Sequence, residues 1–306
     1  MVDDASTQWL MFLSGQLDFL GAISRDNWDA VVGADGRLLP QLAGKGMTLH
    51  AASSLSVFYV GFNMKDPVVG PNRKLRQALN CAFDFPQWRR HMNSRCTPSF
   101  GPLPPGVDAR LETPFAYAFD LEKAKRLLAE AGYPGGTDPK TGRRLHLEIS
   151  IGRATSDARE SAELMQSFFA RVGVDLEAKF MTWDAYLRAV SEGRTQMFFL
   201  GWVGDYPDAE NFLQLFHSKN VSPGANHSCY ENADFDRVYD AALAAKTAAE
   251  RNALWREAQE IVRKDCPWIF LHCPMNYTLI WDRIGGYAPT DFPYGMEKHW
   301  RLMKEK

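Results

Sequence analysis

Two carboxylates and two aromatic rings lie close together in GWVGDYPD, the first eight residues of the stretch GWVGDYPDAENF at residues 201–212. They belong to Asp205, Asp208, Trp202 and Tyr206. Asp208 directly precedes the helical pattern AENFLQLF and is predicted to cap that helix, because its side-chain oxygen can accept a hydrogen bond from a free backbone N–H. Asp205 has no such obvious structural role. It either bonds to the backbone of its own turn or serves a ligand.

The residues before this stretch predict alternating strands and helices. The expected elements are a strand in LHLEISI (145–151), a helix from about Asp157 to Gly173, a strand in VDLEAKF (174–180), a helix in WDAYLRAVSEG (183–193) capped by Thr182, and a buried strand in MFFLGW (197–202). Such a βαβαβ unit favours parallel strands with right-handed crossovers. Ligands bind beyond the carboxyl ends of such strands, which is where the stretch at 201–212 begins.

The rest of the chain predicts ordinary packing elements. Helices are expected in NRKLRQALNCAFDF and FDLEKAKRLLAEAGYPGG, the second capped by Asp120, and two more in FDRVYDAALAAKTAAERNALWREAQEIVRKDCP. WIFLHC is expected to be a short buried strand. The Pro- and Gly-rich segment CTPSFGPLPPGVDARLETPF is predicted to be an extended surface excursion.

Most enzyme and cofactor signatures are absent from the sequence. It contains no GxxxxGK[ST] loop, no GxGxxG after a strand, no HExxH and no GxSxG. The seven histidines and five cysteines show no metal-ligand spacing, although His272 stands beside Cys273. Neither a cofactor nor a metal is therefore expected, and pairing of the cysteines stays open.

Composition excludes further classes of protein. The chain has 306 residues, is 45% hydrophobic and carries a formal net charge of −2, with no basic footprint for nucleic acid. Its longest apolar runs are far shorter than the roughly 20 residues that a membrane helix needs. The N-terminus, MVDDASTQ, is acidic and polar, so no signal peptide is expected in this chain.

Four segments carry a resemblance to a known family. They are, in chain order, YVGFNMKDPVVGPNRKLRQALNCAFD, FDLEKAKRLLAEAGYP, WDAYLRAVSEGRTQMFFLGWVGDYPDAENFL and IGGYAPTDFPYGMEKHWRL. In that order they resemble the oligopeptide- and dipeptide-binding proteins, which are extracytoplasmic solute-binding proteins of family 5 that feed ABC importers. The resemblance runs from about residue 6 to the end of the chain.

The resemblance implies an α/β, periplasmic-binding-protein-like type II fold, in which two lobes close on a ligand. It implies that residues 1–64 and 275–306 form part of lobe I, and that 65–274 form the complete lobe III. The signal peptide, the rest of lobe I and a small extra domain are then missing, so the sequence is expected to be a fragment. The full-length protein is expected to be periplasmic or extracytoplasmic. Open edges in the partial lobe predict self-association.

The resemblance also implies roles for particular residues. In the family, an aspartate that matches Asp205 pairs with the α-ammonium of a bound peptide, and such a charge-assisted bond fixes where the peptide begins. Trp202 and Trp183 match aromatic positions that line side-chain pockets. Tyr206 is expected to brace the loop more than to touch ligand.

Other positions depart from the family pattern. Gly61 precedes Phe62 and Asn63 in the FN-type hinge motif, where oligopeptide binders have an acidic or aromatic residue. His272 and Cys273 stand where tyrosines are common, so peptide length and even peptide chemistry stay open.

Three functions are compatible with these features. The first is a binding protein that delivers short peptides, or a related solute such as a metal chelate, haem, sugar or opine, to an ABC permease in the membrane. The second is the ligand-sensing domain of a regulator. The third is an enzyme that uses Asp205 and His272 as an acid/base pair, which requires both within about 3 Å of a reacting group. The first is the hypothesis that we carry forward, with no catalysis.

Overall fold

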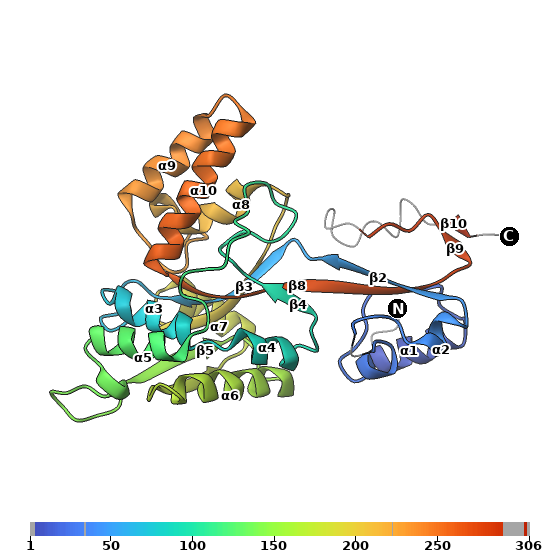
Figure 1. Ribbon diagram of the computed structural model, residues 1–306, viewed down its shortest axis with the longest axis horizontal. Coiled ribbons are helices and arrows are strands. Elements are labelled where there is room, and N and C mark those ends of the chain that lie inside the picture. Colours follow the sequence, from blue (N-terminus) through green and yellow to red (C-terminus); the bar gives the residue numbers. More distant parts are fainter. Residues whose placement is uncertain (1–3, 34, 222, 290–302, 305–306) are drawn as a thin grey trace. The chain divides into compact units, whose positions relative to one another are not determined.

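The chain forms two compact units in the computed structural model, which describes residues 4–33, 35–221, 223–289 and 303–304 (Figure 1). The first unit comprises Met1–Leu55, Arg89–Thr97 and Cys273–Lys306, and the second comprises Ser56–Trp88 and Pro98–His272. The division expected from the resemblance, at 1–64 with 275–306 and at 65–274, stays a prediction. The closing motif lies outside the described residues from residue 290 to Leu302.

The second unit holds most of the helices and a mixed sheet. Its elements are β3 (Ser56–Phe62), α3 (Arg73–Ala82), the start of α4 (Phe85–His91), α5 (Leu121–Glu130), η2 (Pro134–Gly136), β5 (His146–Ile151), α6 (Ser156–Ala170), β6 (Asp175–Phe180), α7 (Trp183–Ser191), β7 (Met197–Val203), α8 (Ala209–Leu213), η3 (Gln214–Phe216), η4 (Ser218–Asn220), α9 (Ala233–Ala244), α10 (Ala248–Asp265) and the first part of β8 (Trp268–Trp281).

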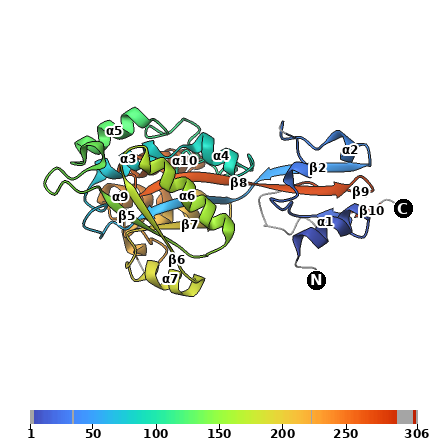
Figure 2. The same ribbon diagram turned by 90° about the horizontal axis from the view of Figure 1, so that it is seen from below.

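The sheet of the second unit has the strand order β8-β3-β7-β5-β6. β5 is parallel to both β6 and β7, so the predicted βαβαβ unit is confirmed. β3 enters between β7 and β8 and is antiparallel to both. Helix α6 lies along one face of the parallel strands (Figures 1 and 2), where it buries Met165, Phe168 and Phe169. The alternating apolar side chains of β5 are fully buried beneath it.

Of the two N-caps predicted in this unit for α5 and α7, one makes the capping hydrogen bond and the other does not. Asp120 caps α5 as predicted, by accepting a hydrogen bond from the Lys123 N–H at 2.9 Å. Thr182 stands at the N-cap of α7, but its side chain makes no capping hydrogen bond, so that part of the prediction is wrong. The helical patterns that predicted α3, α9 and α10 are confirmed.

The Pro- and Gly-rich segment is not the surface excursion that its composition predicts. It contains the short strand β4 (Cys96–Pro98) and buries Leu103 and Phe115. Proline has no N–H to satisfy, so such a segment can be buried where its carbonyls find donors. Gln259 donates to the Ala109 carbonyl at 2.9 Å and thereby supplies one.

The first unit is built on the second part of β8. Its other elements are α1 (Ala5–Leu13), β1 (Phe19–Leu20), η1 (Trp28–Ala30), α2 (Pro40–Ala43), β2 (Met47–Ser53), β9 (Ile284–Gly285) and β10 (Met303–Lys304). β2 pairs with β8 from Met47↔Trp281 to Ser53↔Met275. The prediction of a short strand in WIFLHC was therefore too short, because pairing with β2 extends β8 to Trp281. A core around Phe12, Trp28 and Leu279 fills this unit.

None of the helices in the described part of the chain is long and apolar enough to cross a membrane.

Candidate functional site

The loop after β7 is anchored at its far end by Asp208. Its carboxylate accepts a hydrogen bond from the Glu210 N–H at 2.8 Å, which confirms the predicted cap of α8. The same carboxylate accepts hydrogen bonds from both terminal nitrogens of Arg251 on α10, at 2.6 and 2.9 Å. Burial alone would raise the pKa of Asp208, but the bonds from Arg251 and the backbone lower it overall. Both oxygens of Asp208 are therefore engaged in contacts that hold the loop in place.

Asn211 organises the residues that the sequence analysis singled out in this loop. Its Oδ1 accepts hydrogen bonds from the Trp202 indole N–H at 2.9 Å and from the Asp205 backbone N–H at 3.2 Å. Its Nδ2 donates to Asp205 Oδ2 at 3.4 Å. Asn211 is 1% exposed, whereas Asp205 is exposed. A buried amide thus fixes the indole and presents the carboxylate at the surface beside it.

Tyr206 turns back onto the helix that follows. Its hydroxyl donates to Glu210 Oε2, and this hydrogen bond raises the pKa of Tyr206. Tyr239 on α9 donates to the other oxygen of Glu210 at 3.2 Å. The contacts of Tyr206 therefore brace the loop, while 41% of its surface stays exposed.

Trp183 begins α7 and lies against the turn after β5. Its ring is 53% exposed and stacks on Tyr186, with ring centroids 5.6 Å apart. A Cβ added at Gly152, the residue after β5, would lie 2.8 Å from Trp183 and 2.6 Å from Tyr186. Because β5, β6 and β7 are parallel, Gly152, Trp183 and Asp205 all follow strands at the same edge of the sheet.

His272 lies in a separate buried cluster. Its Nδ1 accepts a hydrogen bond from the Trp88 indole N–H at 3.1 Å, and its ring stacks on Phe58 at 5.1 Å. Phe58 pairs with Gly201 across β3 and β7, one residue before Trp202. Neighbouring strand residues face opposite sides of a sheet, so the structure does not bring His272 and Trp202 together. Burial lowers the pKa of His272 to about 3, which suits a neutral packing residue.

Asn63 also has its polar atoms engaged within the protein. Its Nδ2 donates to the carbonyls of Gly193 and Thr195, both at 2.9 Å, and its Oδ1 accepts from the Lys65 N–H at 3.0 Å. These bonds hold the turn that leads into β7. Its contacts are those of an anchor for the strand that carries the loop.

The cysteines are all buried free thiols. Burial raises the pKa of Cys81 to about 12 and that of Cys96 to about 11. Within the described residues, one group has metal-ligand spacing: His146, Glu148 and Glu177. It was missed from the sequence because its members come from two strands.

Asn211 and Gly152 are the two residues of the site that sequence reasoning missed. Asn211 is a polar residue inside the apolar pattern NFLQLF, and Gly152 directly follows a predicted strand. Those were the signals available for each. Together the site offers an exposed carboxylate, an indole with a fixed orientation and a second exposed indole. Such a set can bind a cation that carries apolar groups.

Comparison with known families gives one match that covers most of the chain. The model for bacterial extracellular solute-binding proteins, family 5 Middle, matches residues 1–224. Heme-binding protein A of Haemophilus influenzae is 31% identical over 242 residues, which are 78% of this chain and 43% of that protein. The probable di/tripeptide-binding protein 5 of Pseudomonas aeruginosa is 27% identical over 76% of this chain and 43% of its own length.

Solved structures share the fold. HbpA2 from Haemophilus parasuis matches with a TM-score of 0.84 and 24% identity, over 100% of this chain and 57% of that one. The periplasmic binding protein DppA from Helicobacter pylori, in complex with the peptide STSA, matches with a TM-score of 0.79 and 24% identity. This match covers 100% of this chain and 56% of that one. The chain thus spans about half the length of the relatives it matches, and its fold is that of the type II periplasmic binding proteins.

Proposed function

Because the chain belongs to family 5 of the bacterial extracellular solute-binding proteins, we propose that it binds short peptides through the loop after β7. It would do so outside the cytoplasm, as the solute-binding component of an ABC importer, and would pass the peptide to a membrane permease without catalysis. The observation that carries this proposal is the exposed Asp205 carboxylate, fixed beside the Trp202 indole by Asn211.

The chemistry of this pair suits the end of a peptide. A carboxylate accepts charge-assisted hydrogen bonds from an α-ammonium, which is the one group that every unmodified peptide shares. The indoles of Trp202 and Trp183 offer apolar surface without directional demands, so they accept varied side chains. Recognition would therefore fix where the peptide begins and leave its sequence largely free.

The test is a titration with a tripeptide and with its N-acetylated form, on the wild-type chain and on Asp205→Asn. A charge-assisted hydrogen bond contributes about 1.5–3 kcal/mol, so either change alone should weaken binding about ten- to hundredfold. The two losses should not add, because both remove the same contact. Asp108→Asn, a change of another exposed carboxylate in the same unit, is the control and should leave the affinity unchanged.

Two results would overturn the proposal. Additive losses would mean that Asp205 and the ammonium act separately, and indifference to acetylation would mean that the ligand is held in another way. In either case Asp205 would not be the partner of the peptide ammonium.

Haem is the second candidate solute, and it is favoured by the 31% identity to a heme-binding protein. Haem carries no ammonium, so Asp205→Asn should not change its affinity. Titration of haem, followed by the shift of its absorption band, separates the two solutes. Micromolar binding of haem together with no response to tripeptides would favour haem over peptide.

A further inference from the structure

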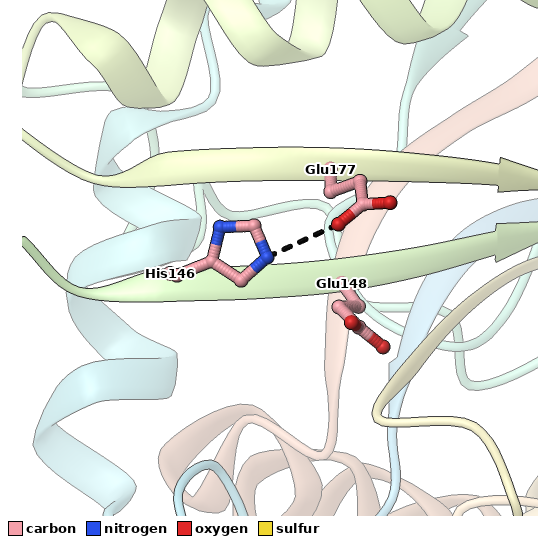
Figure 3. Close-up of side chains that lie close together, drawn as sticks. All are labelled: His146, Glu148 and Glu177. Atoms are coloured by element: carbon pink, nitrogen blue, oxygen red, sulfur yellow. Dashed lines mark ion pairs between the residues drawn. The ribbon is translucent and has the colours of Figure 1, made fainter.

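The outer face of the strand pair β5–β6 carries a cluster of charged side chains. The parallel register places His146 beside Asp175 and Glu148 beside Glu177. His146 Nε2 lies 3.2 Å from Glu177 Oε2. Figure 3 shows the imidazole directed at Glu177, with Glu148 next to it on β5. One ligand atom from each of His146, Glu148 and Glu177 lies within 4.8 Å of the others.

The second nitrogen of His146 is held by another carboxylate. His146 Nδ1 lies 2.8 Å from Asp175 Oδ2, so Asp175 accepts the Nδ1–H. This contact fixes the ring orientation and directs Nε2 at Glu177. Histidines that bind metals in proteins almost always have such a carboxylate or carbonyl at their other nitrogen. The arrangement therefore differs from a simple cluster of acidic groups.

We propose that His146, Glu148 and Glu177 form a surface site for a divalent transition-metal ion, with Asp175 as the residue that orients the histidine. One imidazole nitrogen and two carboxylate oxygens suit Zn²⁺ and its neighbours in the first transition row. Three protein ligands leave at least one position for water. The ligands stand on paired strands, which position side chains more rigidly than loops do. The site shares no residue with the loop after β7, so it does not depend on the proposed peptide binding.

Lys179 gives the proposal a distinctive consequence. Its Nζ lies 2.6 Å from Glu148 Oε1, and the two side chains are 42% and 41% exposed. An exposed ion pair of this kind contributes little free energy, so a metal ion can displace the ammonium from Glu148. Removing the ammonium should therefore strengthen metal binding. A set of ion pairs that only stabilised the strand pair would predict no metal binding in any variant.

The experiment is calorimetric titration of the full 306-residue chain with Zn²⁺ in a non-chelating buffer at neutral pH. We expect one site with a dissociation constant on the order of micromolar. His146→Gln and Glu177→Gln should each weaken it at least tenfold, and Asp175→Asn about tenfold. Lys179→Met should tighten it up to about fivefold. His50→Gln, a change of a half-buried histidine in the first unit, should leave it unchanged.

A second measurement guards against a variant that fails to fold. The melting temperature should rise with Zn²⁺ for the wild type and for Lys179→Met, and by less for His146→Gln, because only a folded site binds the ion. Absence of Zn²⁺ binding below about 1 mM would overturn the proposal. So would Zn²⁺ binding that His146→Gln and Glu177→Gln leave intact, or weaker binding in Lys179→Met.

Discussion

Replacing Asn211 by alanine should disorder the Trp202 indole and the Asp205 backbone, because both donate hydrogen bonds to its amide oxygen. The amide accepts two hydrogen bonds, from the Trp202 indole and the Asp205 N–H, and it is 1% exposed. Each neutral hydrogen bond contributes about 1 kcal/mol, and donors left without a protein acceptor cost more where water cannot reach them. Trp202 is only partly buried, so water replaces some of the loss. We expect Asn211→Ala to lower the free energy of unfolding by about 2–3 kcal/mol.

Urea denaturation, followed by far-UV circular dichroism, measures this loss of stability. Asn252→Ala is the matched control, since Asn252 is a half-buried asparagine on α10, and it should change stability by less than about 0.5 kcal/mol. The ¹⁵N-labelled indole resonance of Trp202 should also move in Asn211→Ala, because its N–H loses its acceptor. If Asn211→Ala costs no more than the control and leaves the Trp202 resonance in place, Asn211 does not organise the loop.

Two further predictions concern residues that support the site. His272 is neutral in the folded protein, because burial lowers its pKa from about 6.5 to about 3. The unfolded chain therefore binds a proton that the folded protein does not. The contribution of His272 to stability should be lost as pH falls below about 6.5. Between about pH 6.5 and 5 the wild type should lose about 2 kcal/mol more than His272→Asn in urea denaturation, and equal losses would refute this. Gly152→Ala should cost about 1–3 kcal/mol, because a Cβ there would overlap two aromatic rings of α7. Gly101→Ala is its control, since the nearest atom to a Cβ there lies at 3.7 Å, and equal effects of the two changes would contradict the argument.

Periodic patterns predicted the central fold well. The alternation in β5 and β6 and the helical spacing in α6 reflect burial on one face, which is a local property of the sequence. Asp208 and Asp120 were identifiable as caps because a cap bonds within its own turn. The same reasoning failed at Thr182, where a suitable residue type stands at the cap position without making the bond.

Features that depend on distant pairing could not be read from the sequence. Strand β8 runs on past Cys273, where β2 pairs with it, although Pro274 interrupts its apolar pattern. The Pro-rich segment is partly buried, and its Ala109 carbonyl finds a donor in Gln259, far along the chain. The roles of Asn211 and Gly152 likewise arise from tertiary contacts, which no local pattern records.

The most direct test of peptide binding at the loop after β7 uses the indole resonances of ¹⁵N-labelled tryptophan. The resonances of Trp202 and Trp183 can be assigned by replacing each residue with phenylalanine. A tripeptide with a free amine, added up to about 1 mM, should shift these two resonances in a saturable way, while its N-acetylated form should shift them far less. If both peptides leave the Trp202 resonance unmoved while other tryptophans respond, the ligand binds elsewhere and the proposed role of the Asp205 loop is wrong.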